Sequence, residues 1–145
     1  MSKNIIGQKT NFPPLLHLSY ILQQVSDELL LDKAGVGLSQ ARIMSVLHQS
    51  TPVSQRSVAV SLAQTEANVS RQLRQMKKQG LVKISKDKKD GRQRDVTLTS
   101  KGHNSYKKAE KLLKKQQSQF LRLLASSEVK AFERATHNLS KTLNG

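Results

Sequence analysis

Regular hydrophobic spacing begins just after Pro13 and Pro14. Leucine and valine side chains recur there at steps of three and four residues, which is the spacing of one face of an α-helix. This stripe predicts a helix over residues 15–31, ended by Gly35 and Gly37. The stripe consists of Leu15, Leu18, Leu22, Val25 and Leu29, and it is widened by Leu16, Ile21 and Leu30.

Three shorter helices are predicted between residues 38 and 80. Ser39, Ser54 and Thr65 each precede a helical pattern and are favourable N-cap residues, because a hydroxyl oxygen can accept a hydrogen bond from a free backbone N–H. Gly80 is expected to end the last of these helices. Their core-facing residues are predicted to be Ile43, Met44 and Leu47, then Val58 and Leu62, then Val69, Leu73 and Met76.

The hydrophobic period then changes from helical to alternating. Residues 81–86 and 94–99 alternate with period two around a charged turn at Gly91, which predicts a β-hairpin. A long helix is expected from an N-cap at Ser100 to about Ala125, and a last helix from an N-cap at Ser127. The predicted fold class is mainly α with a small β-hairpin wing.

Helices two to four followed by a hairpin have the order of a winged helix-turn-helix. A helix about 10–12 Å across fits the major groove of B-DNA. The helix before it crosses the backbone and sets its angle of entry, and the hairpin extends toward the adjacent groove. We therefore expect double-stranded DNA as the partner.

The charge distribution supports a polyanionic partner. The chain carries 25 Lys and Arg against 10 Asp and Glu, a formal net charge of +15. Residues 67–115 hold 16 of these cations and four acids, a local net charge of +12. A concentrated basic segment of this kind favours nucleic acid over a merely solvated surface.

The outer face of the fourth helix holds the candidate DNA contacts. Arginine can bond guanine, and asparagine or glutamine can bond adenine, through two hydrogen bonds each. Residues near the N-terminus of the helix are expected to lie deepest in the groove, and lysines near its end to meet phosphates. The candidates are Thr65, Ala67, Asn68, Ser70, Arg71, Gln72, Arg74, Gln75 and Lys78.

The turn of the hairpin supplies a second set of contacts. Arg92 follows Gly91 and is predicted to enter a narrow minor groove. Asp87 and Asp90 are each expected to hold a neighbouring Arg or Lys in position. The phosphates on either side are assigned to Lys88, Lys89 and Arg94.

Residues 38–47, 68–82 and 87–102 resemble the MarR family of bacterial transcription regulators. The pattern from the wing to the next helix is the specific part. Asp87, Asp90 and Arg92 match the family's wing, and Lys89 stands where arginine is commoner, which should weaken any bidentate contact there.

The resemblance implies a homodimeric transcription regulator, commonly a repressor, that binds a pseudo-palindromic site. Dimerisation is assigned to residues 12–35 and 100–145, DNA binding to 36–99, and a mobile arm to 1–11. The apolar stripe of the first helix and the apolar face of the last also exceed what a small winged domain can cover, which favours an interface.

The resemblance further implies release of DNA by a small, often phenolic or anionic, effector. The expected cleft lies near Leu16, Ile43, Leu47 and the start of the long helix. Its candidate polar residues are His17, Tyr20, Arg42 and His48. The chain has no cysteine, which excludes the thiol-oxidation switch of the family.

Other function classes find little support. The histidines have no metal spacing and no phosphate-binding or protease motif occurs, so we expect no enzyme, no cofactor and no metal. No apolar run approaches about 20 residues, and residues 1–7 do not form a secretory signal. We expect a cytoplasmic protein without membrane contact.

Three alternatives remain. An architectural protein that binds duplex without sequence preference would use the same charge. It would not explain why the fourth helix carries side chains that can bond base edges. A domain used for protein contacts does not explain the basic segment. Single-stranded RNA usually requires aromatic stacking residues, and aromatic residues make up only 3% of this chain.

Overall fold

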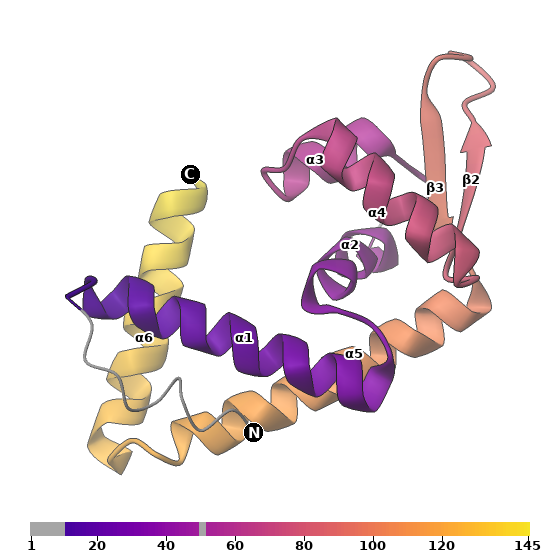
Figure 1. Ribbon diagram of the computed structural model, residues 1–145. Helices are drawn as coiled ribbons and strands as arrows, with labels where there is room; N and C mark the ends of the chain where they lie inside the picture. The colour runs from indigo at the N-terminus through magenta and orange to yellow at the C-terminus, as the bar shows by residue number, and fades with distance from the viewer. Residues whose placement is uncertain (1–10, 50–51) are drawn as a thin grey trace. The chain divides into compact units, whose positions relative to one another are not determined.

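The computed structural model describes residues 11–49 and 52–145 (Figure 1). The chain divides into two compact units, and the boundary falls inside one helix, between Glu110 and Lys111. Each unit is described by itself. The mobile arm expected over residues 1–11 lies outside the described residues, apart from Asn11.

The first unit begins with four helices, as the hydrophobic spacing predicts. They are α1 (Pro14–Ala34), α2 (Leu38–Gln49), α3 (Gln55–Ser61) and α4 (Glu66–Lys78). Helix α1 ends at Gly35, whose φ of 68° is in the left-handed region that glycine adopts without steric cost.

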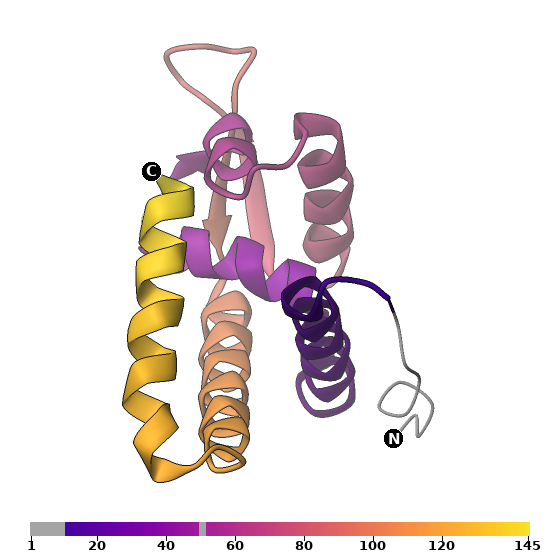
Figure 2. The ribbon, with the colours of Figure 1, turned by 90° about the vertical axis from the view of Figure 1, so that its left-hand side faces the viewer.

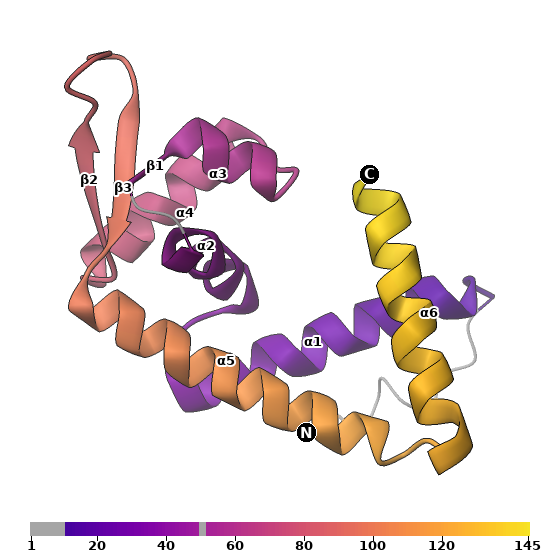
Figure 3. The same ribbon diagram turned by 180° about the vertical axis from the view of Figure 1, so that it is seen from behind.

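The first unit also contains a three-stranded antiparallel sheet, whose first strand lies between α2 and α3 (Figure 3). The predicted hairpin is confirmed as β2 (Val82–Lys86) and β3 (Arg94–Leu98), with Ile84 opposite Val96. The third strand, β1 (Val53–Ser54), pairs with the other side of β3 and was not predicted. Two residues are too few to show an alternating pattern.

The turn of the hairpin extends beyond α3 and α4 (Figure 2). After β3 the chain enters α5 (Ser100–Leu121), and α6 (Ser126–Asn144) completes the chain. Helix α5 stops four residues short of the predicted end at Ala125. The predicted order of four helices, a hairpin and two helices is confirmed.

Two of the predicted N-caps are confirmed. The Ser54 hydroxyl oxygen accepts a hydrogen bond from Ser57 N, and the Thr65 hydroxyl oxygen accepts one from Asn68 N. These two caps define the starts of α3 and α4, the helix pair of the helix-turn-helix.

The other three predicted N-caps are wrong, because different residues do the capping. Ser39 lies inside α2, and Asp27 Oδ1 of α1 accepts the hydrogen bond from Leu38 N at 2.8 Å. Ser100 is already helical, and the Thr99 hydroxyl accepts from Gly102 N. Ser127 lies inside α6, the cap position is held by Ala125 two residues earlier, and the Ala125 N–H donates to Glu128 Oε1.

The core of the first unit lies between the helices and the sheet. The predicted inner line of α4 is confirmed, because Val69, Leu73 and Met76 are fully buried. Other large, fully buried side chains are Leu30 from α1, Ile43, Met44 and Leu47 from α2, Val58 from α3 and Val96 from β3.

A tight joint connects the end of α4, strand β3 and the start of α5. Thr99 donates from its hydroxyl to Gly80 O at 2.6 Å and from its backbone to Leu81 O at 3.0 Å. Lys101 Nζ donates to Gln79 O at 2.8 Å. A Cβ on Gly102 would lie 2.1 Å from Leu81 O, so only glycine fits. The joint therefore holds the hairpin against the end of α4.

The second unit, residues 111–145, consists of the end of α5 and all of α6 and contains no buried residue. Helix α6 is amphipathic, with Val129, Phe132, Leu139 and Leu143 on one face. Within the chain these side chains stay accessible: Leu139 is 51% and Leu143 82% exposed.

Candidate DNA-binding surface

The outer face of α4 carries cations and amides. With the apolar line of α4 buried, Arg71, Arg74, Gln75 and Lys78 are exposed. Thr65 and Ala67, at the start of the helix, are exposed as well, whereas Ser70 is half-buried. All of these candidates come from one helix and the residue that caps it.

A chain of side-chain hydrogen bonds links this face to α2. Gln64 Oε1, in the turn before α4, accepts from Asn68 Nδ2 at 3.0 Å and from Gln72 Nε2 at 3.1 Å. The Ser39 hydroxyl donates to Gln72 Oε1. Arg71 Nη2 donates to Asn68 Oδ1 at 2.9 Å. The guanidinium of Arg71 is therefore oriented before any ligand arrives.

This network divides the candidates into two kinds. Asn68 and Gln72 are half-buried, and both ends of each amide already have protein partners. Sequence reasoning missed Gln64, which joins them. The sequence did hold a signal for this contact. Gln64 stands four residues before Asn68, and residues four apart lie on the same face when the helical spacing is extended back into the turn.

The only acidic residue in the first turn of α4 is Glu66. Arg56 of α3 lies 3.8 Å from it, Nε to Oε1, and both side chains are largely exposed. Among the described residues, no ion pair engages the cations of α4 or of the hairpin turn. These cations therefore keep their charge available for a polyanion.

The aspartates of the hairpin turn hold neighbouring cationic residues through their backbone. Asp87 Oδ1 accepts from the backbone N–H of Lys89 at 2.8 Å, and Asp90 Oδ1 accepts from that of Arg92 at 3.0 Å. Neither carboxylate forms an ion pair with a cationic side chain in the described residues. The prediction that each aspartate holds a neighbouring Lys or Arg in position is confirmed, and the contact is with the backbone N–H, since an Asp two residues ahead of an N–H favours a local turn.

The effect of these turns is to stabilise the backbone and leave the cations free. Backbone hydrogen bonds between Asp87 and Gln93, and between Gln93 and Asp90, close the loop at 3.0 Å each. The exposed cations of the turn and of the strand that follows are Lys88, Lys89, Arg92 and Arg94.

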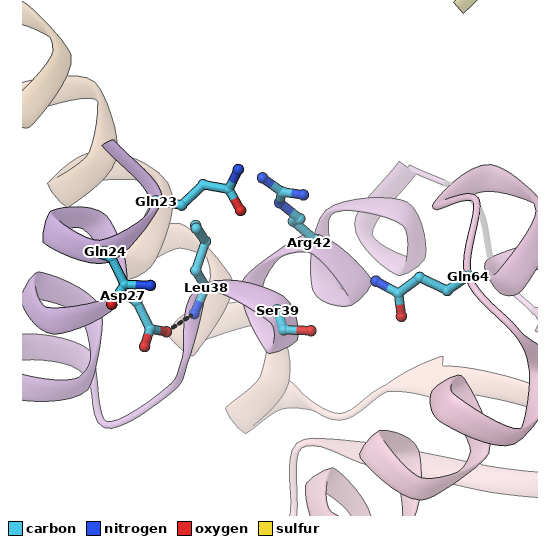
Figure 4. A pocket seen from close by; sticks show the side chains of 7 residues that line it. All are labelled: Gln23, Gln24, Asp27, Leu38, Ser39, Arg42 and Gln64. Atoms are coloured by element: carbon cyan, nitrogen blue, oxygen red, sulfur yellow. Dashed lines mark hydrogen bonds between the residues drawn. The ribbon is translucent and has the colours of Figure 1, made fainter. Parts of the chain in front are cut away.

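One of the four candidate effector residues lines a groove of the first unit. An open groove of about 300 Å³ lies between α1, α2 and the turn before α4, and Arg42 is the only candidate that lines it (Figure 4). The other lining residues are Gln23, Gln24, Asp27, Leu38, Ser39 and Gln64. Ile43 and Leu47, expected near the cleft, are instead fully buried in the core.

The other effector candidates lie elsewhere in the first unit. His17 and Tyr20 belong to α1, where Tyr20 is 56% exposed. His48, on the last turn of α2, contacts His103 and Tyr106 of α5.

No helix of the described residues is long and apolar enough to cross a membrane.

A capped helix pair, an exposed basic second helix and a basic hairpin define a winged-helix DNA-binding protein. The sequence agrees: residues 40–116 match the model of the winged helix DNA-binding domain family, and the chain belongs to that family. The matched family is one of DNA-binding domains. The sequence matches none of the curated proteins compared with it.

Solved structures of MarR-type regulators share the fold. MarR is similar with a TM-score of 0.82 at 16% identity, over 94% of this chain and 95% of that one. The Staphylococcus aureus MepR–DNA complex has a TM-score of 0.78 at 21% identity, over 94% of this chain and 98% of that one. PcaV of Streptomyces coelicolor, bound to its natural ligand, gives 0.74 at 19% identity, also over 94% and 98%. The predicted resemblance to the MarR fold is confirmed.

Proposed function

We propose that this protein is a transcription regulator that binds double-stranded DNA at specific sequences. The observation that carries the proposal is the outer face of α4, where Arg71 is held by Asn68 and flanked by the exposed side chains of Arg74 and Gln75. An oriented guanidinium loses less conformational freedom on binding, which favours a bidentate contact with guanine.

The network behind Arg71 sharpens the assignment of base readers. Asn68 and Gln72 lose existing hydrogen bonds if they turn toward a base, so we assign them to positioning Arg71 and the start of α4. Direct base contacts then fall to Arg71, Arg74 and Gln75, and phosphate contacts to Lys78. Thr65, Ala67 and Ser70 provide close approach to the DNA.

The hairpin turn is the proposed minor-groove contact. Asp90 holds the backbone of Arg92, so the exposed guanidinium leaves the loop at a defined point. An arginine in a narrow minor groove reads its negative potential rather than base identity. Lys88, Lys89 and Arg94 are assigned to the phosphates alongside.

We infer that the active form is a homodimer. Units below about 40 residues rarely bury enough apolar surface to be stable without oligomerisation, disulfides or a metal. The second unit, residues 111–145, is that small, has no buried residue and exposes the apolar face of α6. A two-fold dimer suits a pseudo-palindromic operator with half-sites about 34–36 Å apart.

A small anionic effector is proposed for the groove between α1 and α2. Arg42 and Gln23 extend toward one another across its opening (Figure 4). Their guanidinium and amide groups suit a carboxylate. Such an effector would release DNA if it binds best to a dimer whose two α4 helices are wrongly spaced for the operator. The protein would then act as a repressor in the bacterial cytoplasm that responds to the effector.

The test begins with selection of binders from a random duplex library. The enriched duplex is then compared with scrambled DNA across a salt series. A pseudo-palindrome bound about 10³-fold more tightly than scrambled duplex supports the proposal.

The competing function is non-specific architectural binding. In that case no motif is enriched, and affinity for both duplexes falls in parallel along a steep salt dependence. That outcome would contradict the assignment of Arg71, Arg74 and Gln75 as base readers.

A further inference from the structure

Two histidines from separate helices meet at the surface of the first unit. His48 lies on the last turn of α2, and His103 lies on the first turn of α5. Their Nδ1 atoms are 3.2 Å apart. The pair is separated by 55 residues in the sequence, so no spacing motif indicates it.

The distance between these two nitrogens fits a shared metal ion. Imidazole nitrogens bind Zn²⁺ at about 2.0–2.1 Å, so two ligands at a tetrahedral angle are separated by about 3.3–3.4 Å. Without metal, a 3.2 Å contact between two Nδ1 atoms requires that one carries the proton and the other accepts it. A metal ion can replace that proton without moving either helix far.

The surroundings favour one orientation of the two rings. The His48 and His103 rings are inclined at 66°, with centroids 5.4 Å apart. The ring of Tyr106 also contacts that of His48, with the two centroids 4.6 Å apart. His48 is exposed, so an ion can reach the pair from solvent.

We propose that His48 and His103 form a binding site for a divalent transition metal of the Zn²⁺, Ni²⁺ or Cu²⁺ type. In the described part of the chain, no group of three or more His, Asp, Glu or Cys side chains gathers around a common point. The chain therefore supplies two neutral nitrogen ligands, and water fills the remaining positions.

The ligand set predicts the selectivity of the site. Imidazole binds Cu²⁺, Ni²⁺ and Zn²⁺, whereas Mg²⁺ and Ca²⁺ require oxygen ligands. The expected order of affinity is Cu²⁺ above Ni²⁺ and Zn²⁺, with the tightest binding in the micromolar range because only two protein ligands take part. The bound ion links α2 to α5 and so stabilises the folded first unit.

The test uses the full chain without an affinity tag and stripped of metal. Zn²⁺ and Ni²⁺ are titrated in competition with a chromophoric chelator, for the unchanged protein and for His48→Gln and His103→Gln. His137→Gln is the matched control, because His137 is an exposed histidine on α6. We expect one ion per chain, affinity at least tenfold lower in both pair variants, and an unchanged control.

A second measurement separates metal binding from a folding defect. Circular dichroism checks that each variant is folded, and Zn²⁺ is expected to raise the melting temperature of the unchanged protein and of His137→Gln but not of His48→Gln. Equal affinities in all four proteins, or saturation by Mg²⁺ at similar concentrations, would overturn the proposal. Neither readout involves DNA, so failure here is distinct from failure of the proposed regulatory function.

Discussion

Helices α4 and α6 are both amphipathic, yet their apolar faces have different environments. The line of α4 is fully buried by the chain itself. On α6, Leu139 and Leu143 remain more than half exposed. The hydrophobic period shows in both cases that a face is meant to be covered, but it does not say which chain covers it.

The difference extends to the two units that contain these helices. The first unit has a core, a sheet and internal hydrogen-bond networks, so it can hold the candidate DNA-binding side chains by itself. The second unit lacks a buried side chain anywhere along residues 111–145. We therefore expect substitutions in the first unit to act on folding and DNA contacts, and those on the apolar face of α6 to act on assembly.

The largest expected effect comes from placing charge on the apolar face of α6. Phe132→Asp combined with Leu139→Asp should convert the proposed dimer to monomers, because a carboxylate without a partner is costly to bury. Sedimentation velocity measures the change in mass, and operator affinity should fall with it. Lys130→Asp with Arg134→Asp, on the opposite face of the helix, is the control that should stay dimeric. An unchanged mass in the first variant would refute the assembly role of this face.

The next effect is on folding of the first unit. Gly102→Ala places a methyl group against Leu81 O, and overpacking of this kind costs about 1–3 kcal/mol, with the upper end expected because the contact is with the backbone. Chemical denaturation monitored by circular dichroism measures the loss. Gly91→Ala is the matched control, because nothing lies within 4 Å of the added Cβ, and its effect should stay within about 0.5 kcal/mol. Equal stability of both variants would contradict the tight joint at the start of α5.

A smaller effect is expected from removing a base contact while assembly stays intact. Arg71→Ala should cost about 1–3 kcal/mol of operator binding and relax specificity at one base pair. Fluorescence anisotropy on the selected operator and its single-base variants measures both. Arg134→Ala in the second unit should leave specificity unchanged. Equal losses on operator and random duplex would reassign Arg71 to a phosphate.

The smallest effect is expected at the hairpin turn. Arg92→Ala should weaken binding most when the sequence flanking the site is rich in A·T pairs, because the narrow minor groove there has the more negative potential. Affinity is compared on operators with A·T-rich and G·C-rich flanks. Insensitivity to the flanks would remove the minor-groove role and leave a phosphate contact.

Much of the candidate site could be predicted from the sequence. The Thr65 cap and the line of Val69, Leu73 and Met76 define where α4 begins and which way it faces, so the exposure of Arg71 and Arg74 follows from helical geometry. These are local properties. The same holds for the hairpin, whose alternating residues form β2 and β3 almost as predicted.

Other parts of the site depend on residues that are distant in the sequence. Asp27 caps α2 from eleven residues away, and Ser39 bonds Gln72 across 33. No local pattern indicates such partners, so the predicted cap at Ser39 was wrong and the bond from Ser39 to Gln72 was missed. The pairing of β1 with β3 belongs to the same class.

The sequence by itself determined the helices, the hairpin, the buried line of α4 and the basic middle of the chain, because helix periodicity, capping and charge are properties of neighbouring residues. Only the tertiary structure decided which amides of α4 already form hydrogen bonds within the protein. It also decided that Gly102 packs against Leu81 O and that His48 contacts His103. These depend on contacts between distant segments, which form only when the core brings the helices together.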